Sequence, residues 1–163
     1  MQVKKMTHMA MYASLAVVLS IFESFIPFFD GYTIPGMKLG LANIVILYVL
    51  YTYSFKEAFC IALLKVFIVA LCRTGLFSFS FYFSLLGSVF SVSAMGFVKR
   101  INIFSILGVS IVGSFTHCLG QLFIAYFLLD IHLLSYLPFM LLLSVPTGIL
   151  TGYMSKKLLM IQK

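Results

Sequence analysis

The sequence predicts an all-α integral membrane protein, a single bundle of six transmembrane helices that occupies residues 1–163. Of these residues, 63% are hydrophobic and only 9% are charged, whereas soluble domains carry about 25% charged and 45–50% apolar residues. Apolar segments close to the ~20 residues that a spanning helix needs follow one another along the chain. The composition excludes an ordinary soluble enzyme, a disordered regulator and a secreted disulfide scaffold.

We expect the helices at about residues 10–29, 39–53, 57–77, 79–98, 104–129 and 134–154. The first helix follows Lys4 and Lys5 but lacks a convincing signal-peptide cleavage site, so we interpret it as a retained helix. Its small residues form a face suited to close packing against a partner helix. These residues are Ala10, Ala13, Ala16 and Ser20.

Proline, glycine and charged residues separate most of the predicted helices. They lie at residues 27–36, 53–57, 99–102 and 130–132. Glu57 suits the first turn of the third helix, where the helix dipole favours a carboxylate. The boundary near Ser78 is the least marked, because apolar residues continue across it.

The basic residues predict the topology. With the N-terminus inside, eight of the eleven Lys and Arg residues fall on the cytoplasmic side, as the positive-inside rule requires. They are Lys4, Lys5, Lys56, Lys99, Arg100, Lys156, Lys157 and Lys163. We therefore expect an N-in, C-in, multi-pass protein of a bacterial plasma membrane. The net charge of +7 is scattered rather than clustered, so a nucleic-acid partner is not expected.

Three cations are not needed for this topology: Lys38, Lys65 and Arg73. Glu23 also falls in the outer half of the bundle. A charge at a helix centre costs at least about 2.5–3.5 kcal/mol on insertion scales, so such residues usually face a cavity or a partner. Lys65 lies roughly 12 Å into the third helix, and an eight-residue spacing leaves Arg73 about 80° around from it. This separation allows both side chains to border one cavity.

Simpler roles for these charges remain open. Lys38 precedes the second helix and could hold an anion at the helix N-terminus, or it could be a membrane-surface anchor. Glu23 could form a buried salt bridge with Lys65 or Arg73, which does not exclude a site.

A polar stripe follows one face of the fifth helix, at Ser110, Ser114, His117 and Gln121. Serines in the fourth helix are better explained by helix packing. For His117 and Gln121, a ligand site and structural hydrogen bonding are equally compatible with the pattern.

Several chemistries lack their motifs. The sequence has no Walker A motif, no Asp-rich metal motif and no nucleophile elbow. Cys60, Cys72 and Cys118 lie in apolar segments without paired spacing, so neither a disulfide nor a metal site is predicted. We expect no cofactor and no enzymatic activity from this chain alone.

Three motifs resemble a known family. The stretch PGMKLGLAN at residues 35–43, Arg73-Thr74-Gly75, and His117-x-x-Gly120-Gln121 are similar to motifs of the Gx transporters. That family is also labelled heptaprenyl diphosphate synthase component I. The resemblance covers nearly the whole chain. It departs from the family at Cys118, where an Asn is expected.

The resemblance implies a fold like the S components of energy-coupling-factor transporters. These are six-helix bundles that hold a vitamin-like molecule near the outer face and work with a transmembrane coupling subunit and ATPases on separate chains. Small residues of the first helix would face that subunit, although this chain has no Ala-x-x-x-Ala. The other label implies an accessory partner of a polyprenyl diphosphate synthase.

We therefore expect a substrate-binding membrane subunit for uptake of a small anionic, partly apolar metabolite, such as a quinone or isoprenoid precursor. The expected anion ligands are Lys38, Lys65 and Arg73, and the orienting residues are Asn43, His117 and Gln121. One alternative is a non-catalytic component I of a heptaprenyl or polyprenyl diphosphate synthase in menaquinone side-chain synthesis. Another is a proton-coupled carrier that acts alone through Glu23 and His117.

Overall fold

The computed structural model describes residues 2–23, 25, 40–129 and 137–161, and in this part of the chain all regular structure is helical. The prediction of six helices is confirmed. They are α1 (Gln2–Glu23), α2 (Leu41–Thr52), α3 (Phe55–Val69), α4 (Phe79–Ile101), α5 (Ile106–Leu129) and α6 (Leu137–Ile161), with a π-helical turn, η1 (Ala70–Thr74), directly after α3. The first helix begins earlier in the chain than the hydropathy suggests, and the last ends later.

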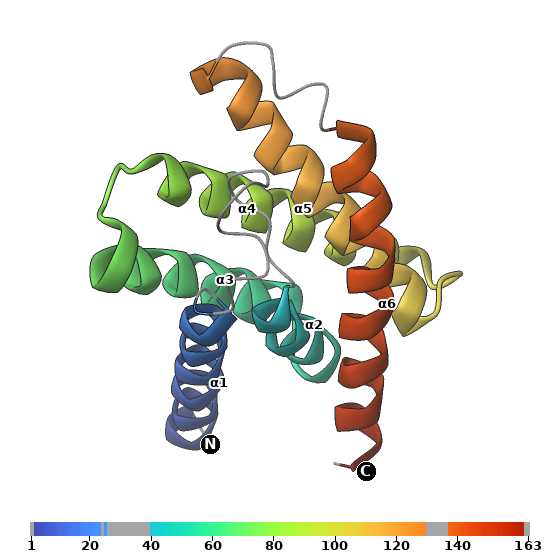
Figure 1. Cartoon of the computed structure of the whole chain (residues 1–163). Helices are drawn as coiled ribbons and strands as arrows, with labels where there is room; N and C mark the ends of the chain where they lie inside the picture. The colour runs from blue at the N-terminus through green and yellow to red at the C-terminus, as the bar shows by residue number, and fades with distance from the viewer. Residues whose placement is uncertain (1, 24, 26–39, 130–136, 162–163) are drawn as a thin grey trace.

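Three of these helices are long and apolar enough to cross a membrane: residues Val3–Glu23, Phe79–Ile101 and Ile106–Leu128. Helix α2 is apolar but has only 12 residues. The arrangement of all six helices as membrane spans stays a prediction. The start of α1 and the end of α6 lie at the same end of the molecule (Figure 1), as an even number of crossings would require.

The core is built around α2. Eight of its twelve residues are buried, which is typical of a helix that is apolar on every side. Ile46, Leu47, Val49 and Leu50 are at most 1% exposed. Helix α2 contacts α1, α3 and α6, and it lies between α1 and α6 in Figure 1. The short helix is therefore enclosed by longer ones.

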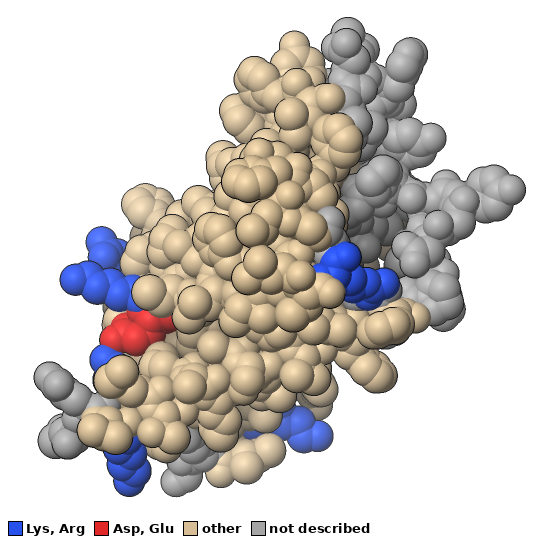
Figure 2. Space-filling view, turned by 90° about the vertical axis from the view of Figure 1, so that its left-hand side faces the viewer, with Lys and Arg blue, Asp and Glu red and all other residues tan. Residues whose placement is uncertain are grey.

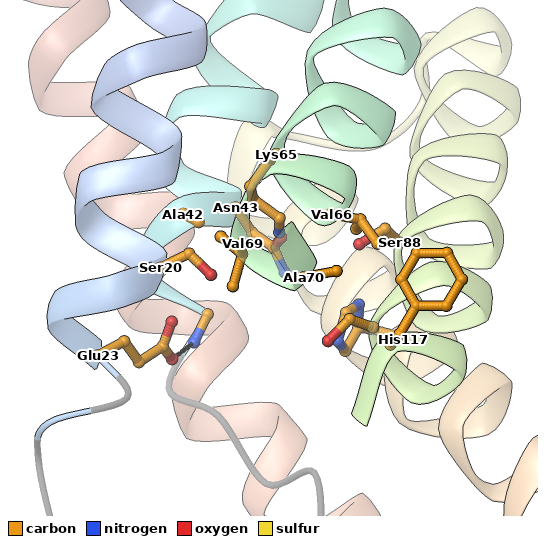
Figure 3. Close-up of a pocket in the computed structure, with 13 residues that line it drawn as sticks. Ser20, Glu23, Ala42, Asn43, Lys65, Val66, Val69, Ala70, Ser88 and His117 are labelled. Atoms are coloured by element: carbon orange, nitrogen blue, oxygen red, sulfur yellow. Dashed lines mark hydrogen bonds between the residues drawn. The ribbon is translucent and has the colours of Figure 1, made fainter. Parts of the chain in front are cut away.

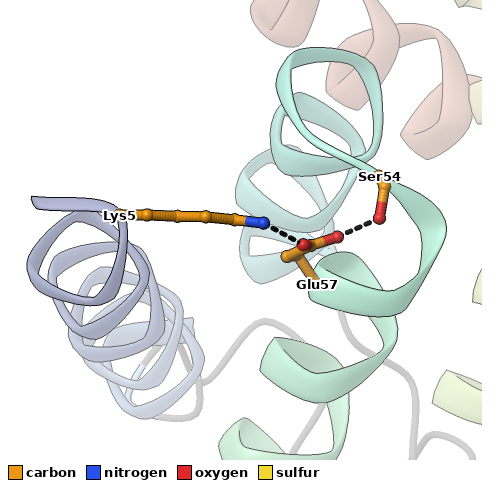
Figure 4. A network of polar contacts seen from close by, with 3 residues as sticks. All are labelled: Lys5, Ser54 and Glu57. Carbon is orange, nitrogen blue, oxygen red and sulfur yellow. Dashed lines mark hydrogen bonds and ion pairs between the residues drawn. The ribbon is translucent and has the colours of Figure 1, made fainter. Parts of the chain in front are cut away.

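Polar contacts tie the helix ends together near the N-terminus. The Lys5 amine contacts the Glu57 carboxylate, which also accepts a hydrogen bond from the Ser54 hydroxyl (Figure 4). Lys99 at the end of α4 donates to the Leu50 carbonyl oxygen at 2.6 Å and lies 5.0 Å from the Tyr51 ring centroid. We call this end, which carries Lys5, Lys56, Lys99 and Arg100, the basic end.

Glycines allow α4, α5 and α6 to approach closely. A methyl group added at Gly120 would lie 2.8 Å from the Leu86 carbonyl oxygen, and one added at Gly148 would lie 2.7 Å from Ile111 Cα. Ser110 Oγ and Thr151 Oγ1, which join α5 to α6, are 2.7 Å apart. Small residues of this kind are the usual means of packing helices in lipid. Figure 2 shows that much of one face of the molecule carries no charged side chain.

Candidate functional site

A polar cavity lies where α1, α2, α3, α4 and α5 meet. It is lined by Ser20, Glu23, Gly40, Ala42, Asn43, Lys65, Val66, Val69, Ala70, Phe81, Ser84, Ser88 and His117, and its volume is about 30 Å³. Figure 3 shows the labelled side chains converging from separate helices. This volume holds one or two water molecules rather than an organic ligand. We call it the first cavity.

Two buried charged residues face the first cavity from different helices. Glu23 ends α1 and Lys65 lies in the middle of α3, and each side chain is only 7% exposed. The Glu23 carboxylate accepts a hydrogen bond from the Gly40 backbone amide (Figure 3). An acid and a base in one apolar bundle partly neutralise each other, which lowers the cost of keeping both away from water.

The backbone turn at Gly40, just before α2, shapes one side of the first cavity. Gly40 has a φ of +78°, a left-handed conformation that favours glycine. This turn places the Gly40 amide against Glu23 and Asn43 beside the cavity. A methyl group at Gly40 would lie 3.4 Å from Asn43 Nδ2. The Gly40 amide thus holds the Glu23 carboxylate, and the Asn43 side chain lies close to the same glycine.

The His117 ring of α5 lies directly on Gly87 of α4. A methyl group added at Gly87 would be 2.9 Å from His117 Cε1. Gln121 Nε2 lies 3.3 Å from His117 Nε2. The imidazole thus packs against Gly87 and contacts Gln121 one helical turn away on α5.

A second cavity, of about 40 Å³, lies between α2, α5 and α6. Its lining consists of Gly40, Asn43, Ser114, His117, Cys118, Gln121, Met140, Leu143, Ser144 and Thr147. Gly40, Asn43 and His117 line both cavities. These three residues therefore form a shared wall. The wall separates the compartment with Glu23 and Lys65 from an uncharged one.

Ser88 carries an open hydrogen-bonding position. Its side chain is 1% exposed, it lines the first cavity, and its hydroxyl has no hydrogen-bond partner among residues that the structure describes. Buried polar groups are nearly always hydrogen-bonded, to protein or to an ordered guest such as water. The cavity thus presents one hydroxyl ready for an enclosed water or a polar ligand atom.

The predicted site residues fall into three groups. Glu23, Asn43, Lys65, His117 and Gln121 line one or both cavities. Arg73 lines neither: it is exposed in the π-helical turn, with its guanidinium carbon 4.7 Å from the Phe25 ring centroid. Lys38 lies outside the described residues.

Arg73 lies within a π-helical turn that directly follows α3. The Gly75 amide bonds to the Ala70 carbonyl oxygen, at 2.8 Å and five residues back. A turn closed in this way changes the angular position of the residues after it. The 80° separation from Lys65 assumed an unbroken α-helix, so it does not hold.

The small residues of α1 mostly pack inside the chain. Ala13, Ala16 and Ser20 are 7%, 0% and 5% exposed, whereas Ala10 is exposed. Helix α1 contacts α2 and α3, so this stripe serves packing within the bundle, and Ser20 also lines the first cavity.

Ser144 and Thr147 of α6 were not predicted as site residues. They belong to a stripe at Ser144, Thr147, Thr151 and Ser155, whose spacing of three and four residues marks one helix face. That spacing was visible in the sequence. Thr151 and Ser155 are buried, and the Ser155 hydroxyl donates to the Ile44 carbonyl oxygen at 3.0 Å.

The side chains that line the two cavities are suited to binding a polar ligand. Across residues 2–23, 25, 40–129 and 137–161, no three His, Cys, Asp or Glu side chains are placed to hold a metal ion. The two cavities instead offer a cation, a carboxylate, an imidazole, two amides and several hydroxyls.

Comparisons with known proteins give the family. No curated protein and no solved structure matches this chain. The sequence model of a family described as heptaprenyl diphosphate synthase component I matches residues 12–158. That range includes every described residue of both cavities. The chain therefore belongs to the heptaprenyl diphosphate synthase component I family.

Proposed function

We propose that this protein is an integral membrane subunit that binds a small ligand with an anionic group in the two cavities. The observation that carries the proposal is the gathering of Glu23, Lys65 and the open Ser88 hydroxyl in one cavity. A charge in the middle of a helix inside an apolar bundle, as Lys65 has in α3, costs at least about 2.5–3.5 kcal/mol. Such a cost is typical of a functional site rather than of a purely structural one.

The ligand class follows from the lining. Lys65 provides the positive charge for an anionic group, and Asn43, His117 and Gln121 provide hydrogen bonds that orient it. Met140 and Leu143 offer an apolar surface in the second cavity. A carboxylate or phosphate on a partly apolar body, as in a quinone or isoprenoid precursor, matches this combination.

A ligand of this size exceeds both cavities, whose volumes are about 30 and 40 Å³. Binding therefore requires the shared wall to move so that the two spaces join. His117 is the movable part of that wall, because a side chain can rotate whereas the Gly40 backbone is held by Glu23.

The chain would act as the binding subunit of an energy-coupling-factor-type uptake transporter, with the coupling subunit and ATPases on other chains.

The family match favours a second candidate function. A component I of a heptaprenyl diphosphate synthase would be a non-catalytic membrane partner of a catalytic subunit on another chain. Binding of an anionic isoprenoid in the same cavities is compatible with this role. Co-purification with a polyprenyl diphosphate synthase, and a changed product chain length when this chain is deleted, would distinguish it from uptake.

The test is ligand-dependent stabilisation of the purified full-length protein. Farnesyl diphosphate and a naphthoate are suitable probes, and thermal unfolding followed by circular dichroism is suitable because the chain has no Trp. We expect at least one probe to raise the unfolding temperature, with the shift lost in Lys65→Gln and Ser88→Ala. Arg73→Gln is the matched control, since Arg73 lines neither cavity. Absence of stabilisation by every anionic probe would contradict the proposal.

A further inference from the structure

A third cavity lies at the basic end, between the start of α3 and the end of α4. It is lined by Phe55, Ser93, Gly96, Phe97 and Arg100, and its volume is about 200 Å³. It is larger than either cavity of the candidate site and shares no lining residue with them. We call it the α3–α4 groove.

The floor and wall of the groove are apolar. The Phe55 ring lies so close to Gly96 that an added methyl group would overlap it. Phe97, one residue further, is 68% exposed. A glycine thus lets the two helices meet at Phe55, while Phe97 extends the wall outward to the surface. In a membrane, an exposed aromatic wall of this kind is available to a hydrocarbon chain.

The mouth of the groove is positively charged. Arg100 is exposed and makes no ion pair with any acidic residue in the described part of the chain. Its neighbour Lys99 is already engaged with the Leu50 carbonyl oxygen and the Tyr51 ring. Lys56, which follows Phe55 in the chain, is also exposed but does not line the groove. Arg100 therefore keeps its donors for an outside partner.

The nearby carboxylate does not neutralise this mouth. Glu57 contacts Lys5 and Ser54 (Figure 4). This leaves Arg100 as an uncompensated cation beside an apolar groove. That pairing of charge and apolar surface is complementary to a phosphate group carried on an acyl chain.

We propose that the α3–α4 groove binds an anionic phospholipid of the surrounding bilayer. The guanidinium of Arg100 donates to the headgroup phosphate, for which its planar fork of donors is well suited, and an acyl chain lies along Phe97. Basic pockets between transmembrane helices at the cytoplasmic side are a recognised means of binding acidic headgroups. The site is independent of the proposed ligand cavities.

The experiment measures lipid selectivity of the full-length protein. The protein is purified, equilibrated with equal amounts of phosphatidylglycerol and phosphatidylcholine, and examined by native mass spectrometry for retained lipid. We expect preferential retention of phosphatidylglycerol. Arg100→Gln should lower the preference about fivefold, the effect of one basic residue near a lipid surface. Phe97→Ala should weaken retention of both lipids.

Lys157→Gln is the matched control, because it removes one exposed charge from α6 away from the groove. An unchanged preference in Arg100→Gln, or an equal loss in Lys157→Gln, would overturn the proposal. Farnesyl diphosphate provides the third arm. If it displaces phosphatidylglycerol from the wild type but not from Arg100→Gln, the groove takes a prenyl diphosphate and the assignment to phospholipid is wrong.

Discussion

Helices α1–α3 pack around the large apolar side chains of α2, whereas helices α4–α6 approach one another through glycines. In the first region, Ile46, Leu47 and Leu50 fill the space around α2. In the second, Gly120 and Gly148 bring a neighbouring backbone to within contact distance. The first cavity lies between the two regions, with Glu23 and Lys65 from one and Ser88 and His117 from the other.

The difference teaches how each region tolerates change. Burying apolar side chains gains little in lipid, because the surroundings are equally apolar. The stability of each region then depends on how closely its atoms pack, and a different kind of substitution disturbs the packing in each. The α1–α3 region is sensitive to removing atoms, and the α4–α6 region is sensitive to adding them.

The largest expected effect comes from removing atoms near α2. Leu47→Ala leaves a cavity where the side chain is 1% exposed, and we expect a loss of about 2–5 kcal/mol in the free energy of unfolding. Denaturation in mixed micelles, followed by circular dichroism, measures it. Leu71→Ala, at a position that is 67% exposed, should change stability by less than about 0.5 kcal/mol. Equal losses of stability in Leu47→Ala and Leu71→Ala would contradict the view that the α1–α3 region depends on the packing around α2.

Adding one methyl group to the α4–α6 region comes next. Gly120→Ala forces the Leu86 backbone away, and we expect a cost of about 1–3 kcal/mol. Gly108→Ala is the control in the same helix, because its nearest neighbour is a side-chain atom, Phe104 Cδ1, at 3.3 Å. Gly108→Ala should cost clearly less in the same denaturation measurement. A larger loss at Gly108 would show that backbone proximity does not set the tolerance.

A smaller effect is expected at the junction of the two regions. Gly87→Ala meets the His117 ring, which can rotate, so we expect a cost near 1 kcal/mol, the lower end of overpacking. A double-mutant cycle isolates the contact. In a His117→Ala background, Gly87→Ala should cost almost nothing. If the cost persists there, the ring is not what Gly87 accommodates.

The smallest effect is expected from the ion pair that ties α1 to α3. Glu57→Gln should cost about 0.2–1 kcal/mol, as is usual for exposed pairs, since the Lys5 side chain is 51% exposed. The cost should shrink as salt is added. Lys4→Gln is the control, and it should show neither the loss nor the salt dependence. A salt-independent loss would point to the Ser54 contact instead.

The sequence allowed much of this arrangement to be predicted. The apolar segments, and the polar residues that separate them, locate six helices, because the hydropathy of a segment indicates whether an apolar environment suits it. Polar side chains within apolar segments could be singled out because an apolar helix bundle has few other reasons to keep them in its interior. They are Glu23, Lys65, His117 and Gln121. Their gathering around two cavities follows from the packing of the helices, which hydropathy does not encode.

Other features could not be predicted for local reasons. The π-helical turn before Gly75 depends on which carbonyl oxygen the Gly75 amide bonds to, and it changes the angular position of Arg73 relative to Lys65. The glycine contacts depend on which helix faces which, so Gly87 gave no sign that it supports His117. Ser144 and Thr147 follow a helical spacing that the sequence shows. That they line the second cavity could be learned only from the structure.

The shortness of α2 has a consequence for how the chain is made. Twelve residues at 1.5 Å each extend about 18 Å, well short of the ~30 Å of hydrocarbon in a bilayer. A segment of this length is poorly suited to partition into lipid unaided as it leaves the ribosome. We expect it to enter the bilayer together with α1 or α3, as a hairpin whose second arm supplies the missing length. Biogenesis would then assemble the protein in pairs of helices, and the most enclosed helix would depend on its neighbours from the moment of synthesis.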